Sequence, residues 1–315
     1  MALPLSGPLS LTDIQTEFGG SNPVGLDEYY RGGAYVTANN TSVPTSGAIS
    51  ISNFYGAVRQ FAFTISANLS TPQNLRTVAL ANGWNGSDAL LATLGTNVTI
   101  SSDTTGSPAL TVNGSFPNGV VFINNGYVVG MGGAGGNGGN FDVVGLPGSP
   151  GAAGGNALTV SVAITLQNNG TIGGGGGGAG GGGTVYDPYN GPYGWVGGGG
   201  GGGRTGVVNS SGGAAGTGNY YQRSRDPTPG SSGTFSSGGS GGQSGAPPNP
   251  DARGGAGGTG GDWGTAGAAG QDGYAPPAFG LPVTSGGAGG GAGSAIVGNA
   301  NITYTATGTR LGSIT

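Results

Sequence analysis

The apolar residues of the first 129 positions follow short periodic patterns that predict small secondary-structure elements. Alternating apolar and polar residues have the two-residue period of a strand and predict strands at 61–66, 97–100, 109–112 and 120–123. The run 74–81 predicts a helix with Thr71 as its cap, Pro72 at its first position and Gly83 as its stop. We therefore expect a β-rich region with one helix near 72–81.

Residues 1–60 predict a compact, non-repetitive module. Thr12 or Ser10 can cap a short helix, because Thr12-Asp-Ile-Gln15 fits a capping box, and Gly19-Gly20 can stop it. One short turn and two extended stretches are expected next, at 26–31, 35–37 and 48–52. Since the module has few apolar side chains, we expect it to pack on another subunit or a partner.

A repeat links this region to the rest of the chain. Ala109-Leu-Thr-Val112 followed by Asn124-Asn-Gly126 is echoed by Ala157-Leu-Thr-Val160 followed by Asn168-Asn-Gly170, and a looser third copy lies at 295–305. Each of the first two copies is a strand, an Asn-Gly turn and a second short strand that runs into a glycine tract. The repeat predicts stacked strand units with glycine-rich excursions.

Glycine changes this picture in the middle of the chain, where 62 of the 79 glycines lie between residues 130 and 300. Runs such as 173–183 form poor helices and strands, but the extended polyproline-II conformation, with three residues per turn, is open to them. Such segments can pack backbone to backbone and hydrogen-bond laterally. A packed bundle is favoured over a flexible linker because the tracts recur and are separated by aromatic segments that resemble turns.

Charge and composition exclude most chemistry. Charged residues make up 6% of the chain, which has no Lys, His or Cys. A nucleophilic triad, a Schiff base and a metal site with nitrogen or sulfur ligands are therefore excluded, and no cofactor or metal is expected. Isolated aspartates next to turn residues leave a carboxylate glycosidase as an alternative only. Without a basic stripe, nucleic-acid binding is not expected, and no export signal or membrane span is indicated.

Aromatic residues supply the strongest functional signal. Tyr and Trp among Gly, Ser and Asn are typical of antibody paratope loops, where rigid rings give contact area at low entropic cost. We predict receptor contacts by the loop residues Tyr186, Tyr189, Tyr193, Trp195, Tyr220, Tyr221, Arg223, Arg225, Trp263, Tyr274 and Phe279. The alternative is that these rings plug the ends of the bundle or a subunit interface.

Several segments resemble tail proteins of tailed bacteriophages. The stretches 11–20, 26–33 and 49–56 are similar to the N-terminal module of glycine-rich tail proteins, and 124–139, 168–178 and 301–312 are similar to tail-fibre and tail-tip proteins. The alternation of glycine tracts and loops also resembles the tip adhesins of T-even-like long tail fibres. In those adhesins, polyglycine-II helices form a sandwich and distal loops contact the host receptor.

The resemblance implies a virion protein of the phage tail that mediates host attachment. Its expected partners are a bacterial surface receptor, either a glycan or an outer-membrane protein, and other tail or baseplate proteins. Fibres of this kind are commonly trimeric, so a homotrimer is also expected. Residues expected to attach the chain to the virion are Ile14, Phe18, Tyr29, Tyr30, Phe54 and Tyr55. The alternative function is a purely structural fibre or baseplate connector.

The expected fold is mainly β with extensive irregular structure and a fibrous shape. Short helices belong to the attachment module at 1–60, and a β-rich stem spans 61–172. A glycine-rich distal head, built of packed polyglycine-II helices, spans 173–293, and strands at 294–315 return to the stem.

Overall fold

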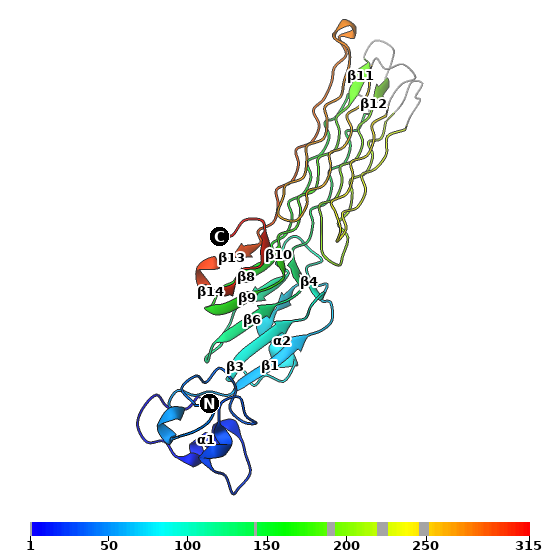
Figure 1. Cartoon of the computed structure of the whole chain (residues 1–315). Coiled ribbons are helices and arrows are strands. Elements are labelled where there is room, and N and C mark those ends of the chain that lie inside the picture. The colour runs from blue at the N-terminus through cyan, green and yellow to red at the C-terminus, as the bar shows by residue number, and fades with distance from the viewer. Residues whose placement is uncertain (1, 142–143, 188–192, 219–225, 246–251) are drawn as a thin grey trace.

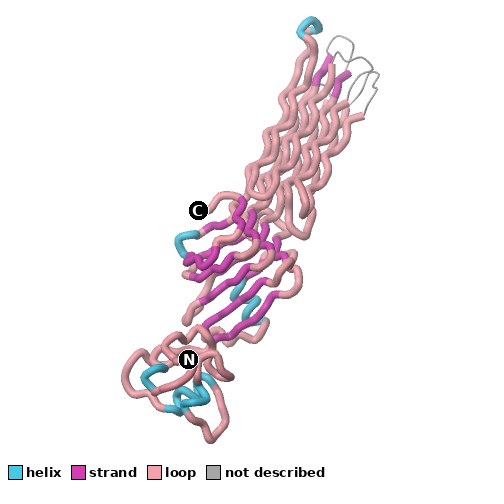
Figure 2. Tube along the Cα trace, in the orientation of Figure 1, coloured by secondary structure: helices cyan, strands magenta, loops and turns pink. Residues whose placement is uncertain are grey.

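The chain forms three parts along one axis, as the computed structural model shows (Figure 1). The structure describes residues 2–141, 144–187, 193–218, 226–245 and 252–315. The N-terminal module (residues 2–58) is followed by a stem of short strands and then by a long bundle that is drawn almost entirely as loop (Figure 2). None of the described helices has the length and apolar character of a membrane span.

The N-terminal module contains helix α1 (Leu11–Phe18) and two 3₁₀ helices, η1 (Leu26–Tyr29) and η2 (Ile51–Phe54). Helix α1 begins after Ser10, whose hydroxyl accepts the N–H of Asp13 at 3.2 Å while the Asp13 carboxylate accepts the N–H of Ser10 at 2.9 Å. The capping box is therefore Ser10 to Asp13, and the one predicted from Thr12 is wrong. The strand predicted at 48–52 is also wrong, because η2 occupies its second half.

The module buries a small core of its own. Its buried apolar residues are Leu3, Ile14, Phe18, Tyr29, Val36, Val43, Phe54 and Ala57. The Phe54 ring packs edge-on against Tyr29, with ring centroids 6.2 Å apart, and against Phe18 at 6.4 Å. The aromatic rings thus compensate for the low number of apolar side chains.

The stem is a stack of coils, and each complete coil contributes one strand to each of three parallel sheets. The sheet orders are β1-β3-β6-β9-β14, β2-β5-β8-β13 and β4-β7-β10-β15. The strands are β1 (Gln60–Ile65), β2 (Gln73–Asn74), β3 (Ala89–Leu94), β4 (Thr99–Ser101), β5 (Leu110–Val112), β6 (Val120–Asn124), β7 (Tyr127–Val129), β8 (Leu158–Val160), β9 (Ile164–Asn168), β10 (Thr171–Gly173), β13 (Ile296–Val297), β14 (Ile302–Ala306) and β15 (Thr309–Leu311). Helix α2 (Leu75–Ala81) lies between β2 and β3.

Ladders of identical or similar apolar side chains fill the space between the three sheets. Leu110 pairs with Leu158, which pairs with Ile296, and all three side chains are fully buried. The repeat is confirmed by this register. Its Asn-Gly turn is not a hairpin, since β6 and β7 belong to different sheets. The buried Asn124 instead donates its amide N–H to the Asn168 carboxamide oxygen of the next coil at 2.7 Å.

Two details of the stem differ from the sequence prediction. Helix α2 begins one residue after Asn74, whose carboxamide accepts the N–H groups of Arg76 and Thr77, so Thr71 and Pro72 do not start it. Strand β3 was not predicted, because Ala89-Leu-Leu-Ala-Thr-Leu94 has no clean alternation. It is buried on most of both faces as a central strand of a parallel sheet, where apolar runs replace alternation.

Both glycine-rich excursions leave the stem between successive coils and form one bundle, hereafter the glycine bundle (residues 130–155 and 173–294). Residues 130–155 connect β7 to β8, and residues 173–294 connect β10 to β13. The bundle also contains a short hairpin, β11 (Val185–Asp187) with β12 (Tyr193–Trp195), and the 3₁₀ helix η3 (Pro277–Phe279) at its far end (Figure 1). Residues 130–155 thus lie in the bundle and not in the stem.

Backbone hydrogen bonds with a three-residue period hold the bundle together. Gly175, Gly178 and Gly181 donate their N–H groups to segment 149–155 at 2.8–3.0 Å, and the other N–H groups of the same tract point to other segments. The tract 173–183 is surrounded by the segments 130–139, 149–155, 198–204, 255–264, 265–271 and 287–293. No hydrophobic core is needed to join them, because the backbone supplies both donors and acceptors.

A segment with neighbours on more sides contains more glycine. The central tract 173–183 has a neighbour on every side and is all glycine except Ala179. Segment 130–139, at the surface, carries side chains at every third position: Met131, Ala134 and Asn137. The intervening glycines are required, since a Cβ atom on Gly133 would lie 2.0 Å from the Ala152 carbonyl oxygen.

An aromatic cluster joins the bundle to the stem. Trp263 is buried, packs edge-on against Phe235 with ring centroids 5.0 Å apart, and lies 6.1 Å from the Tyr127 ring of β7. The Arg204 guanidinium stacks 3.6 Å above Trp263 and forms a 2.6 Å ion pair with Asp262. Partial burial acts to raise the pKa of Asp262, but the hydrogen bonds from Arg204 and the Trp263 N–H and the charge of Arg204 hold it below its ordinary value.

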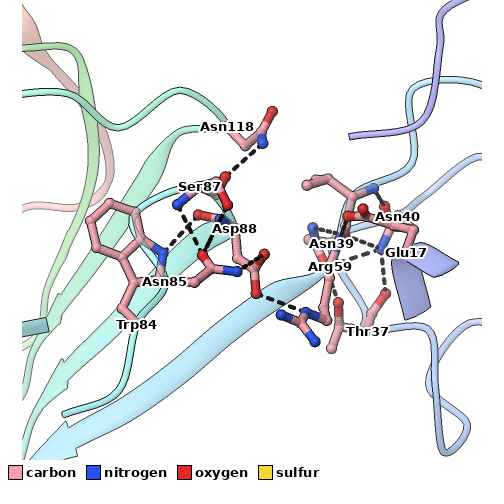
Figure 3. A network of polar contacts seen from close by, with 11 residues as sticks. Glu17, Thr37, Asn39, Asn40, Arg59, Trp84, Asn85, Ser87, Asp88 and Asn118 are labelled. Atoms are coloured by element: carbon pink, nitrogen blue, oxygen red, sulfur yellow. Dashed lines mark hydrogen bonds and ion pairs between the residues drawn. The ribbon is translucent and has the colours of Figure 1, made fainter. Parts of the chain in front are cut away.

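A polar network fixes the N-terminal module on the stem (Figure 3). The backbone N–H of Arg59 donates to the Glu17 carboxylate of α1 at 2.8 Å, while the Arg59 side chain pairs with Asp88 at 2.8 Å. Asn40 donates to the Val58 carbonyl and accepts the Val58 N–H, so the connecting residues are held from both sides. The module and the stem are therefore tied by directed contacts at 58–59.

Gly178→Ala tests the backbone packing. The new methyl group would lie 1.9 Å from the Ala134 carbonyl oxygen, so we expect the free energy of unfolding to fall by about 3 kcal/mol or more, as for severe overpacking. Gly291→Ala is the matched control, because nothing lies within 4 Å of its Cβ position. Denaturant unfolding measures both. Equal stability of the two variants would contradict backbone contact as the basis of the bundle.

Acid titration tests the Arg204–Asp262 pair. Because the folded pKa of Asp262 is lowered, its contribution is present at neutral pH and is lost as the pH falls through that pKa. Asp262→Asn should therefore lower the melting temperature at pH 7, by the equivalent of at most about 1 kcal/mol. The difference from the wild type should shrink below about pH 4. A difference that stays constant on acidification would contradict this assignment.

Candidate functional site

The far end of the glycine bundle lies opposite the stem (Figure 1). Exposed apolar side chains gather at this end. Val144, Leu146, Tyr274, Phe279 and Val283 all lie there, each between 47% and 54% exposed. They come from chain segments that are far apart in the sequence but adjacent in the bundle. A cluster of large apolar side chains on a solvent-exposed surface is typical of a recognition site.

Hairpin β11–β12 forms the base of this surface. Val185 pairs with Trp195 inside the hairpin and makes a further antiparallel bridge to Val283. The Tyr186 ring stacks on Phe141 with centroids 5.8 Å apart and an interplanar angle of 25°. Gly194 permits this approach, because a Cβ atom there would lie 2.9 Å from the Phe141 ring. The hairpin is thus fixed to two neighbouring segments.

A second contact orients the exposed Tyr274. Its backbone exchanges two hydrogen bonds of 2.8 Å with Arg253, and the Arg253 guanidinium lies 5.3 Å from the Tyr274 ring centroid. Phe279 ends η3, and Gly280 follows it in the left-handed conformation, with φ +56°. Tyr274 and Phe279 are therefore exposed rings on ordered backbone.

Two threonines complete the scaffold. Thr184 and Thr284 both direct hydroxyl groups to the Leu146 carbonyl at 3.2 Å, and their hydroxyls lie 3.0 Å apart. This contact ties three segments together below the exposed apolar side chains. The far end is consequently preorganised, which lowers the entropic cost of binding.

The structure separates the predicted receptor residues into three groups. The first group lies at the far end: Tyr186, Tyr274, Phe279 and the half-buried Trp195. Tyr193 lies there too, in β12. Trp263 lies at the opposite end, buried in the aromatic cluster of the stem junction, so its position gives it a packing role. The remaining predicted residues, Tyr189, Tyr220, Tyr221, Arg223 and Arg225, lie outside the described residues.

Some residues of the far end carried no signal in the sequence. Arg253, Val144, Leu146 and Val283 were not predicted, since an isolated aliphatic residue in a glycine-rich chain is unremarkable. Only the fold of the bundle brings them together. Within the described ranges, acidic residues form no group able to hold a metal ion.

The predicted virion-attachment residues fall into two groups. Ile14, Phe18, Tyr29 and Phe54 are core residues of the N-terminal module and support its fold. Tyr30 and Tyr55 are half-buried, and their hydroxyl groups donate to the backbone carbonyls of Gly47 and Gly7. The most exposed apolar side chain of the module is instead Leu5, at 86%, near a groove that Leu3, Pro8 and Thr16 help to line.

Comparison with known proteins identifies the family of this chain. No curated protein matches the chain. A solved structure, the gp37–gp38 adhesin tip complex of the bacteriophage S16 long tail fibre, is similar in fold, with a TM-score of 0.56 and 24% identity over 99% of this chain and 100% of that chain. The model of the family "Phage tail fibre adhesin Gp38" matches residues 60–315, which include the stem and the whole glycine bundle. The chain therefore belongs to the Gp38 family of phage tail fibre adhesins, which bind the host and are not enzymes.

Proposed function

We propose that the far end of the glycine bundle is the surface through which this adhesin contacts its bacterial receptor. The observation that carries the proposal is the gathering of exposed apolar and aromatic side chains there, on segments that backbone hydrogen bonds hold in place. Exposed aromatic rings beside an arginine are the residue types that dominate binding energy at interfaces. A surface glycan or an outer-membrane protein would fit this chemistry.

We also propose that the segments of the bundle are polyglycine-II helices arranged in layers. The three-residue period of the lateral hydrogen bonds and the six neighbours of tract 173–183 support this conformation. Its functional value is stiffness, since every glycine segment is braced by others. The bundle then holds the receptor surface away from the stem.

The N-terminal module is proposed to attach the adhesin to the tail fibre. The family match begins at residue 60, so the module lies outside the adhesin region. In the similar S16 structure, gp38 is in complex with gp37 of the long tail fibre. Leu5 is an exposed apolar anchor for such a contact. The exposed acidic residues of the module, Asp13, Asp27 and Glu28, outnumber its one basic residue, Arg31, so we expect a basic partner surface.

The homotrimer stays a prediction. The central tracts of the glycine bundle find their neighbours within a single chain, and the N-terminal module has its own core. Neither part needs a second copy to bury its interior. The mass of the purified protein in solution decides between one copy and three.

Substitution of the exposed rings tests the receptor surface. Tyr274→Ser with Phe279→Ser should weaken binding of the fluorescently labelled protein to host cells at least tenfold, because aromatic anchors at interfaces contribute about 2 kcal/mol or more. Leu80→Ser is the matched control, since Leu80 is similarly exposed but lies on α2 of the stem. Undiminished binding of the double variant would overturn the proposed surface and favour a purely structural connector.

Substitution of Leu5 tests the attachment. Leu5→Arg should abolish co-purification of the full chain with the tail fibre protein of the same phage, because it removes the apolar side chain and places a positive charge against the basic partner surface. Ser46→Arg adds the same charge at another exposed position of the module and should leave co-purification intact. If both variants co-purify with the fibre protein, attachment uses another face.

A further inference from the structure

A second concave surface lies at the side of the molecule, far from the receptor surface. It is formed where the turn 205–209 of the glycine bundle meets the stem, and Asn68, Asn97, Tyr127, Val207, Asn209 and Phe235 help to line it. Its volume is about 430 Å³, within the range of about 300–1,000 Å³ that is usual for small-molecule sites. Its lining residues include no Asp, Glu, Lys or Arg, so the chemistry of this lateral groove is uncharged.

Three carboxamide side chains supply hydrogen-bonding capacity. Asn68 accepts the backbone N–H of Thr99 at 2.9 Å, which orients its side chain and leaves its NH₂ group available. The exposed side chains of Asn97 and Asn209 make no hydrogen bond with another described residue. Each carboxamide offers two donors and an acceptor in fixed relative positions.

One wall of the lateral groove is aromatic and rigid. Tyr127 meets Phe235 edge-on, with ring centroids 5.2 Å apart and an interplanar angle of 85°. Phe235 is backed by the buried Trp263, which Arg204 covers on its face. Rings that are locked by their own neighbours present an apolar surface at low entropic cost.

The opposite wall is anchored to the stem. The N–H of Val207 donates to the Ser101 hydroxyl of β4 at 3.2 Å. Gly206 allows this approach, because a Cβ atom there would lie 2.2 Å from the Ser101 Cβ. The turn therefore cannot slide over the groove, and Val207 stays 45% exposed at its rim.

We propose that the lateral groove binds a neutral sugar residue. A pyranose ring has one face of C–H groups, which suits the Tyr127 and Phe235 rings, and adjacent hydroxyl groups, which both donate and accept hydrogen bonds. The carboxamides of Asn97 and Asn209 match those hydroxyl groups, and the uncharged lining disfavours ionic ligands. This site is separate from the receptor surface, and its assignment does not depend on that surface.

Saturation-transfer difference NMR on the full chain tests the proposal. The probes are the methyl pyranosides of glucose, galactose and N-acetylglucosamine. The test variant combines Asn97→Gly with Asn209→Ala. Glycine is chosen because Asn97 has a positive φ of 62°, which glycine adopts without strain. The control variant is Phe279→Ser, which alters only the far end.

We expect saturation transfer to at least one of the three glycosides in the wild type and in Phe279→Ser, with at least a tenfold loss of affinity in the double variant. An unchanged melting temperature of the double variant would show that the loss is local. Absence of transfer to all three glycosides overturns the proposal. So does transfer that persists in the double variant, or transfer that disappears in Phe279→Ser.

Discussion

The structure depends on the distance at which two backbones can approach each other. In the glycine bundle, a Cβ atom added to almost any inner glycine would lie about 2 Å from a carbonyl oxygen of the next segment. The absence of that atom lets every third N–H group of a tract reach the same neighbouring segment of the chain. Lateral hydrogen bonds then take the place of apolar contacts, and the composition of the chain follows from the geometry rather than the reverse.

The stem makes this arrangement possible because it decides where each excursion begins and ends. Residues 130 and 155 are the ends of the first excursion, and they lie beside β7 and β8 of successive coils. The second excursion starts from β10, which lies next to β7 in the same sheet. Its first tract therefore begins beside segment 130–139, and the N–H of Gly130 donates to the Gly173 carbonyl at 2.9 Å. The parallel register of the stem is thereby transferred to the bundle, where no side chains could specify it.

The repeat of Ala109-Leu-Thr-Val112 at Ala157 was visible in the sequence because stacked coils bury the same side chains at the same positions. The packing of the glycine tracts was also predictable in outline, since only glycine permits such contacts. What the sequence did not predict was which segments are neighbours in the bundle, because a glycine tract has no side chains to mark its neighbours. For the same reason Trp263 was placed with the receptor residues, whereas it lies at the junction with the stem. Arg253 and Leu146 were missed because their role depends on which segments lie side by side.

A bundle that is joined through its backbone also differs in how its stability changes with temperature. The heat capacity increment of unfolding comes from newly hydrated apolar surface and is reduced by hydrated polar surface. Unfolding of the tracts 173–183 and 197–203 exposes mostly peptide groups, so this part of the molecule contributes little to that increment. A small increment flattens the stability curve. The glycine bundle is therefore suited to keep its shape in cold and in warm surroundings alike.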